Sequence, residues 1–494
     1  MSSSSEKNAL KEKGNYRRVS LENNGNGDGN GYDSHMSSLE IDDPHAPLHK
    51  TNVTQTFLHL VKGYIGPGCL SQPWAYTQIG IQYGVMATII LGILTTYNCL
   101  IVMRRKVQFA DEFSGSHVTY SDVGELAYGL KFRLYVSFSV CIQQLSVCTV
   151  YFSFISDNIA AVASSWDWPK LLQEQRFIMA LVFPFILALC FIKDLRRLSP
   201  VTAAGTFFLF SSFAFLAACG FENWGPVDKS IFMPTSFQFA SIPLATCAIM
   251  YSYEGICLIF PIEAAMIEPQ KFERVFVFSM MCVIAIFTLF ASFCVLAFGE
   301  IDDGSITAYL MSRLEEYDWN FSILAANTLV SLCVLLTYPL QMFPAIDLLS
   351  KIVANAGEHK FVSTAVDDDD ADFEDDDSQS MERDIDNDIF HWDSVLRLGL
   401  VFLTFVLALS VPNVQQLISL AGALSGSSVA LIIPPLLEIK FLQKDGESKL
   451  SAGAFKCYFL LFAGILYGVV GTTTAIVDII NHNEDDIIID SEEG

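Results

Sequence analysis

The sequence predicts an all-α polytopic membrane protein. Of its 494 residues 52% are hydrophobic and only 17% are charged, whereas a soluble chain of this length needs far more charge to cover its surface. Runs without Asp, Glu, Lys or Arg also recur, and several exceed the roughly 20 residues that cross a bilayer as a helix. These runs cover residues 63–103, 198–221, 275–299, 398–437 and 457–477. We therefore exclude a soluble enzyme, a secreted disulfide scaffold and a nucleic-acid-binding protein.

The hydrophobic segments divide into eleven expected membrane spans. They cover residues 53–76, 79–102, 133–162, 176–193, 199–219, 240–262, 275–299, 320–346, 395–411, 414–438 and 455–478. A single helix over residues 398–437 would be about 60 Å long, twice the thickness of the hydrocarbon core. We therefore expect a turn at residues 411–413, where Pro412 and Asn413 favour one.

Charge and composition outside the spans predict the rest of the organisation. The net charge is −25, and residues 350–393 hold fifteen acidic against three basic side chains. We expect residues 1–50, which are polar and rich in Ser, Gly and Asn, to form a disordered tail. The expected order is this N-tail (1–50), transmembrane helices one to eight (51–349), an acidic loop (350–393), helices nine to eleven (394–480) and an acidic C-tail (481–494).

The basic residues predict the orientation. With the N-terminus in the cytosol, 25 of the 29 Lys and Arg residues fall on the cytosolic side, as the positive-inside rule requires. The N-tail and the 350–393 loop are then cytosolic, and the C-tail lies on the opposite side. The acidic loop is predicted to be a solvated linker, with a binding site for a cytosolic regulatory partner as the alternative.

The first span is not expected to be a continuous helix. Three glycines and two prolines fall between Gly63 and Pro73. In a helix each Gly costs about 1 kcal/mol and an interior Pro about 3 kcal/mol relative to Ala. We expect a break at residues 66–68, and a broken backbone at membrane depth is tolerated where it faces a polar cavity or buried protein.

The sixth span carries a carboxyl group, a glycine and a proline inside an apolar run. These are Glu254, Gly255 and Pro261. An ionisable residue at this depth marks a functional cavity. Interruptions in spans one and six are typical of an inverted 5+5 repeat with a substrate site at the membrane midplane. The alternative is that Gly and Pro here only permit kinks and close helix packing.

These segments resemble a known family. Residues 63–73 (GYIGPGCLSQP) are similar to the first-helix signature of the amino acid/auxin permease family, and residues 57–68 are closest to its proton-coupled amino acid transporter branch. Residues 252–255 with 261–263 resemble its sixth-helix pattern, and residues 122–129 resemble the loop before its third helix. The resemblance implies an eleven-helix LeuT-like fold and secondary transport of amino acids, usually driven by protons.

The expected substrate site lies between the two breaks. The half-helix after the first break points free N–H groups and a positive dipole end at the cavity, which suits the substrate carboxylate, although Pro67 has no N–H to offer. The backbone of the second break suits the ammonium group. The six residues expected to bind substrate are Gly66, Gly68, Cys69, Ser252, Tyr253 and Glu254.

His59 and Glu254 are the expected proton-coupling residues. His59 matches a histidine that the resembled branch uses for this purpose, and it precedes Gly66 by seven residues, which is two helical turns. An imidazole exchanges protons near neutral pH. The alternative for His59 is an interfacial side chain bonded to a neighbour. Glu254 can hold the ammonium group or carry the proton, and the sequence does not separate these roles.

Other polar residues in the spans are candidates for the cavity, with helix-packing hydrogen bonds as the alternative. They are Gln143, Gln144, Asn158, Asn327, Ser425, Ser427 and Ser428. Twelve cysteines without a CxxC pair, and a single histidine within a span, give no indication of a metal site. No cofactor is expected; the proton is the expected coupling ion, and sodium is the less favoured one.

The sequence thus predicts a transporter and not an enzyme: a proton-coupled symporter of small neutral amino acids that works by alternating access. Its expected partners are the amino acid and membrane lipid. It is expected in the plasma membrane or in a vacuolar or lysosomal membrane. The alternative function is an amino acid sensor that signals through its cytosolic tails.

Overall fold

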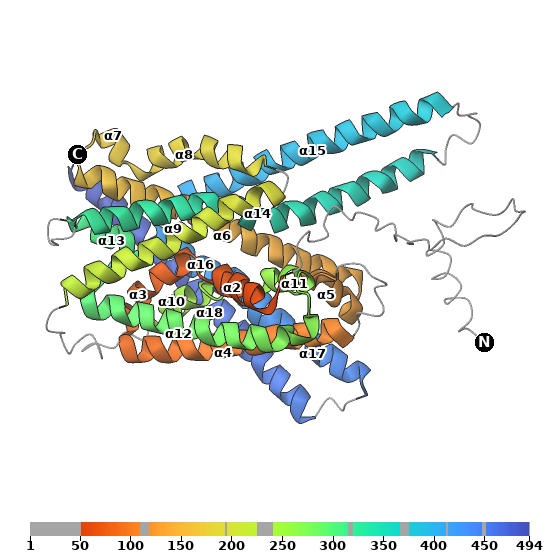
Figure 1. Ribbon diagram of the computed structural model, residues 1–494, viewed down its shortest axis with the longest axis horizontal. Coiled ribbons are helices and arrows are strands. Elements are labelled where there is room, and N and C mark those ends of the chain that lie inside the picture. Colours follow the sequence, from red (N-terminus) through yellow and green to blue (C-terminus); the bar gives the residue numbers. More distant parts are fainter. Residues whose placement is uncertain are drawn as a thin grey trace, which may run out of the picture. The chain divides into compact units, whose positions relative to one another are not determined.

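The computed structural model describes residues 51–108, 118–192, 195–224, 241–314, 320–365, 375–411, 413–446 and 451–493. The predicted N-tail lies outside these ranges. In the first half of the chain the helices are α2 (Val53–Tyr64), α3 (Pro67–Ile79), α4 (Ile81–Gln108), α5 (Tyr120–Tyr128), α6 (Leu130–Ser165), α7 (Lys170–Gln173), α8 (Gln175–Cys190) and α9 (Leu195–Glu222). They are followed by α10 (Ser241–Tyr251), α11 (Ile256–Ala264), the 3-10 helix η3 (Pro269–Lys271), α12 (Phe272–Phe298), α13 (Ile306–Ser312), α14 (Asn320–Ala365), α15 (Asp375–Ser410), α16 (Val414–Ala421), the π-helix η5 (Gly422–Ile432), α17 (Ile433–Lys444) and α18 (Ala452–Glu493) (Figure 1).

The helices confirm a polytopic membrane protein. Within the described ranges nine helical segments are long and apolar enough to cross a bilayer. They cover residues 81–108, 130–165, 200–222, 241–264, 269–298, 320–350, 392–410, 414–444 and 452–481. Large apolar side chains are exposed on these segments, for example Leu289 at 70% and Phe455 at 72%, which suits contact with lipid and not with water.

Two expected irregular segments are partly helical. α14 continues to Ala365 and α15 begins at Asp375, so helix covers much of the acidic 350–393 segment, while residues 366–374 lie outside the described ranges. α18 likewise continues through most of the expected C-tail to Glu493. The physical reason at the C-terminus is local, because no Gly or Pro follows Gly471 before that residue to end the helix.

The turns that separate neighbouring helices have identifiable causes. The turn expected at residues 411–413 is present: α15 ends at Ser410, and the Asn413 side chain caps α16 by accepting from the backbone N–H groups of Gln415 and Gln416. Gly129 joins α5 to α6 with a φ of +85°, a conformation that favours glycine. The Gly129 N–H donates to the carbonyl of Glu125 and so closes α5.

Each half-helix of the first span packs against the opposite half-helix of the sixth span. α2 packs against α11 and α12, whereas α3 packs against α10 and α12. α6 packs against α14, and α14 packs along α9. The backbone before α2 is fixed to the end of α11, because Thr51 N–H donates to the Ala265 carbonyl at 2.7 Å and Ile267 N–H donates to the Thr51 carbonyl at 3.0 Å.

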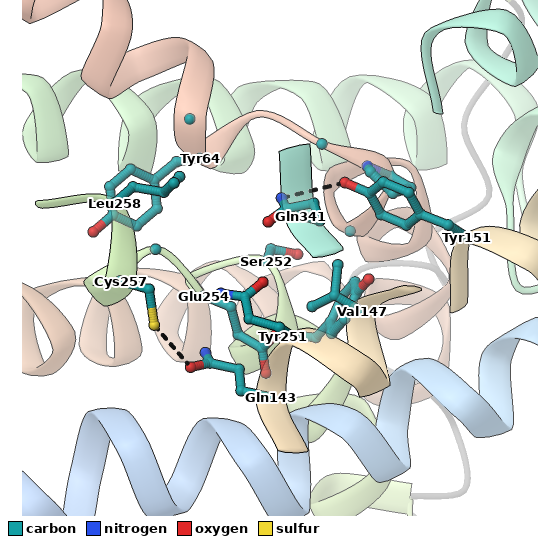
Figure 2. A pocket seen from close by; sticks show the side chains of 16 residues that line it. Tyr64, Gln143, Val147, Tyr151, Tyr251, Ser252, Glu254, Cys257, Leu258 and Gln341 are labelled. Atoms are coloured by element: carbon teal, nitrogen blue, oxygen red, sulfur yellow. Dashed lines mark hydrogen bonds between the residues drawn. The ribbon is translucent and has the colours of Figure 1, made fainter. Parts of the chain in front are cut away.

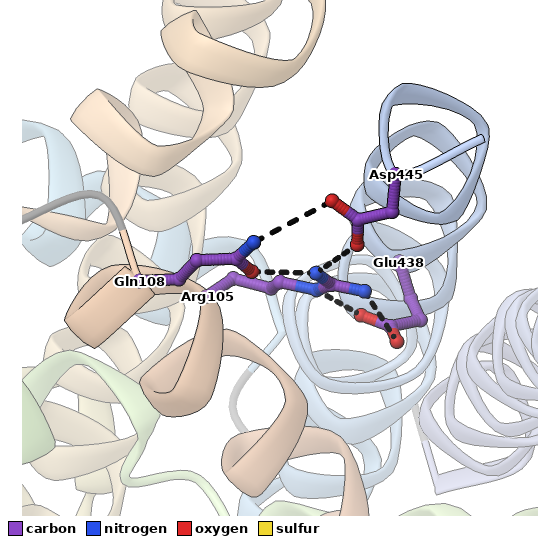
Figure 3. Close-up of polar contacts among 4 residues, drawn as sticks. All are labelled: Arg105, Gln108, Glu438 and Asp445. Atoms are coloured by element: carbon purple, nitrogen blue, oxygen red, sulfur yellow. Dashed lines mark hydrogen bonds and ion pairs between the residues drawn. The ribbon is translucent and has the colours of Figure 1, made fainter.

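Three consecutive bases at the end of α4 bind three different helices. Arg105 forms ion pairs with Glu438 of α17 at 2.8 Å and with Asp445, just beyond α17, at 2.7 Å (Figure 3). The two bases that flank Arg105 in α4 pair with other helices. Arg104 pairs with Glu273 of α12 at 2.5 Å, and Lys106 pairs with Glu263 of α11 at 2.9 Å. Because the Arg105 and Lys106 pairs are largely shielded from solvent, they are worth more than exposed ion pairs. They hold this end of the bundle closed around α4.

Candidate functional site

Both helix breaks that the sequence predicts are present. α2 ends at Tyr64, and α3 begins at Pro67 after an extended Ile65 and Gly66. The break thus lies slightly before residues 66–68, because Pro at the first helical position needs no N–H partner and fits the start of a helix. α10 ends at Tyr251, and residues 252–255 are non-helical before α11 begins.

The two breaks pack against each other in a reciprocal way. A Cβ at Gly68 would lie 2.9 Å from a ring carbon of Tyr251, the last residue of α10. A Cβ at Gly255 would lie 2.5 Å from a ring carbon of Tyr64, the last residue of α2. The tyrosine that ends α2 therefore packs on Gly255 before α11, and the tyrosine that ends α10 packs on Gly68 at the start of α3. Only glycine allows this close approach.

A cavity of about 40 Å³ lies between the breaks (Figure 2). A single water needs roughly 10–15 Å³ by the same measure. The cavity is lined by Gly63, Tyr64, Gly66, Pro67, Gly68, Gln143, Gln144, Val147, Tyr151, Tyr251, Ser252, Glu254, Gly255, Cys257, Leu258 and Gln341. The lining thus combines both breaks with side chains from α6 and α14, and its one ionisable carboxyl group is Glu254.

Five buried polar side-chain atoms of the lining have no hydrogen-bond partner in the part of the chain that the structure describes. They are the hydroxyl oxygens of Tyr64, Tyr251 and Ser252, Oε1 of Gln144 and Oε2 of Glu254. Burying a polar atom without a partner costs about 1–3 kcal/mol. Such a concentration around one cavity indicates a site that a polar ligand or water fills.

The other carboxylate oxygen of Glu254 is held by the tenth span. Ser425 donates its hydroxyl to Oε1 at 3.1 Å, and Gln143 lies beside the same carboxyl group (Figure 2). Ser425 belongs to the π-helix η5, a wide turn that is rare and often found at functional sites. A Cβ at Gly426 would lie 3.3 Å from Oε1, so a larger side chain there would press on the carboxylate.

Of the six predicted substrate residues, Gly66, Gly68, Ser252 and Glu254 line the cavity, and Tyr253 and Cys69 do not. Tyr253 is fully buried on the other side of the break, where its hydroxyl donates to the Thr88 carbonyl at 2.9 Å. Cys69 donates both its N–H, at 3.2 Å, and its thiol, at 3.0 Å, to the Gly66 carbonyl. Its amide is therefore already engaged.

His59 is not brought to the cavity. Its side chain is exposed on α2 and is absent from the lining. The seven-residue spacing to Gly66 does not keep the two on one face, because the helix ends at Tyr64 and the extended residues change the direction of the chain. Its nearest charged neighbour is Lys62, one turn later in α2.

The remaining polar candidates divide between the cavity and helix packing. Gln143 and Gln144 line the cavity, whereas Asn158 joins α6 to α13 and α14. Its Oδ1 accepts from the hydroxyl of Thr307 at 2.8 Å and from the amide of Asn327 at 2.9 Å. Ser427 and Ser428 bond only to carbonyls within their own helix in the described structure.

Tyr64, Tyr151 and Gln341 are lining residues that the sequence analysis missed. Gln341 Nε2 donates to the Tyr151 hydroxyl at 3.4 Å across the cavity (Figure 2). The sequence offers one signal for Gln341, a polar residue between Pro339 and Pro344 of α14. The two tyrosines give no comparable signal.

Comparison with known proteins assigns the chain to a family. The model of the family described as transmembrane amino acid transporter protein matches residues 49–477. The chain belongs to this family. The match begins just before α2, ends within α18 and includes both breaks, so it covers every element of the site. Members are transporters and not enzymes.

Two curated relatives agree with this assignment. The chain is 23% identical to the proton-coupled amino acid transporter-like protein pathetic of Drosophila melanogaster over 447 residues, which cover 87% of this chain and 86% of the relative. It is 25% identical to vacuolar amino acid transporter 3 of Schizosaccharomyces pombe over 300 residues, which cover 60% of this chain and 42% of the relative. The transmembrane amino acid transporter family therefore gives the substrate class, an amino acid, and the membrane setting.

Proposed function

We propose that this transporter is a proton-coupled symporter of small neutral amino acids that works by alternating access. The unpaired polar atoms around the cavity between the two helix breaks carry the proposal. A zwitterion brings a carboxylate and an ammonium group, which together provide the donors and acceptors that these atoms lack. The small cavity and the absence of Lys, Arg and His from its lining disfavour large and acidic side chains.

The two ends of the substrate have separate partners in this proposal. The carboxylate lies at the N-terminus of α3, where the Gly68 N–H is in the first turn and has no acceptor within the helix. The ammonium group lies at the end of α10, next to Glu254 Oε2 and the Ser252 hydroxyl, both of which are unpaired. Each charge of the substrate then lies at a helix-dipole end of opposite sign.

We infer eleven crossings. To the nine long segments we add the broken span α2–α3, whose two halves are each too short alone, and α8, a shorter apolar helix of 16 residues. An odd number puts the termini on opposite sides, and the distribution of bases favours a cytosolic N-terminus. The acidic 350–393 segment is then cytosolic, where a basic regulatory partner has access to it.

The reciprocal packing of the breaks supports a LeuT-like inverted repeat. An axis in the membrane plane that exchanges span one with span six would exchange Tyr64 with Tyr251 and Gly255 with Gly68. It would therefore map the contact of Tyr64 with Gly255 onto the contact of Tyr251 with Gly68. Alternating access then requires α2 and α11 to move against the bundle. When the cavity opens toward the end of the bundle at which α4 ends, the ion pairs of Arg105 and Lys106 must break.

Uptake into proteoliposomes tests the function. We expect the purified protein to accumulate a small neutral amino acid such as alanine when the pH is lower on the side of entry, with no requirement for sodium. Without a pH gradient we expect exchange but no accumulation. Accumulation that needs sodium and ignores pH would contradict proton coupling. The proposed location is the plasma membrane or the membrane of a vacuole or lysosome, where such gradients exist.

His59→Ala is expected to abolish proton-driven accumulation while leaving folding intact. The side chain is exposed and makes no hydrogen bond within the described structure, so its removal costs little stability. We expect counterflow of labelled alanine to persist and the dependence of uptake on pH to disappear. A normal pH profile in the variant would show that His59 is not a coupling residue.

A further inference from the structure

Lys62 is a charged side chain inside the bundle that the substrate site does not use. It lies in the last turn of α2, just before the first break, and is partly buried. Its Nζ donates to the backbone carbonyl of Thr202 in α9 at 3.2 Å. An ammonium ion in a transmembrane bundle is costly and marks a function when it is kept there.

Among the described side chains, α9 and α14 present neutral groups to Lys62. α9 offers the Thr202 carbonyl, and α14 offers the thiol of Cys333, which is 5% exposed. On α2 itself the nearest titratable group is His59, one turn earlier and exposed to solvent. The imidazole is therefore the titratable group of α2 through which a proton could reach Lys62.

The carboxylates of the other neighbouring helices do not pair with Lys62. Glu263 of α11 and Glu273 of α12 are engaged by Lys106 and Arg104. The positive charge thus has no counter-charge within 4.0 Å among the described residues. An amine in such a place can exist in either protonation state, whereas a guanidinium group cannot.

We propose that the ε-amine of Lys62 is a proton-binding site of the transport cycle. The protonated amine holds α2 against α9 through the Thr202 carbonyl. The neutral amine loses most of that attraction, which frees α2 to move. The amine takes a proton from hydronium on one side of the membrane, with His59 as the intermediate carrier, and returns it to water on the other side. No other reactant is consumed.

This inference rests on the proposed function, and the test separates the two. Lys62→Arg keeps a permanent charge, and Lys62→Met keeps the length without charge. Lys131→Met, at an exposed lysine at the start of α6, is the matched control. Each protein is reconstituted, and both pH-driven accumulation and counterflow of labelled alanine are measured.

We expect Lys62→Met to lose accumulation by at least about tenfold, which corresponds to roughly 1.4 kcal/mol, and to retain counterflow. Lys62→Arg, whose permanent charge keeps α2 against α9, is expected to lose both activities. The control should behave as the wild type. Wild-type pH-driven accumulation by Lys62→Arg would overturn the proposal, because a guanidinium group cannot release the proton. Loss of counterflow in Lys62→Met would also overturn it, because a neutral side chain at this position is expected to leave α2 free to move. A wild-type protein that neither accumulates nor exchanges an amino acid would refute the proposed function itself.

Discussion

Glu254→Gln is expected to abolish accumulation of amino acids while the protein still folds. The substitution keeps the shape of the side chain and its contact with Ser425, but it removes the charge next to the unpaired Oε2. Truncating one partner of a buried charge pair costs about 2–5 kcal/mol, which corresponds to at least roughly 30-fold in affinity. Substrate-induced thermal stabilisation of the purified variant measures this loss.

Counterflow separates the two roles that remain open for Glu254. If the carboxylate binds the ammonium group, accumulation and counterflow are lost together. If it carries the proton, counterflow persists and only pH-driven accumulation is lost. Glu222→Gln, at an exposed carboxyl group at the end of α9, is the matched control and should retain both activities. Wild-type accumulation and affinity in Glu254→Gln would contradict both roles.

The sequence predicts the membrane helices well because their signal is local. A charge-free run such as residues 275–299 must either cross the bilayer or be buried, and it forms most of α12. The π-helix η5 could not be predicted in this way. It depends on close contact with α10, where a Cβ at Gly422 would lie 2.0 Å from the Cys247 carbonyl oxygen, and that contact joins spans that are far apart in sequence.

The same distinction applies to the site. Gly66 and Gly68 are recognisable because a helix break at membrane depth is tolerated only where it faces a cavity or buried protein. The direction of a side chain at a helix break is set by the surrounding bundle. Tyr251 faces the cavity, whereas Tyr253, two residues later, packs against Phe287 with ring centroids 5.4 Å apart. Nothing in the local sequence separates these two tyrosines.

Filling the cavity at the first break is expected to abolish substrate binding without unfolding the protein, and Gly66→Val is the substitution that does so. A Cβ at Gly66 would meet only the Tyr151 hydroxyl, at 3.9 Å, and the φ of −141° is accessible to any residue. The added side chain enters a cavity of about 40 Å³, which leaves no room for the substrate carboxylate at the start of α3.

Substitutions at two further glycines serve as comparisons for this prediction. Gly68→Val should also destabilise the fold, because its Cβ would lie 3.0 Å from the Ser252 Cα and overpacking of this kind costs about 1–3 kcal/mol. Gly399→Val, where a Cβ meets nothing within 4 Å, should keep wild-type binding. Thermal stabilisation across a panel of small amino acids measures all three variants. If Gly66→Val folds and binds alanine with wild-type affinity, the substrate does not occupy the cavity between the breaks.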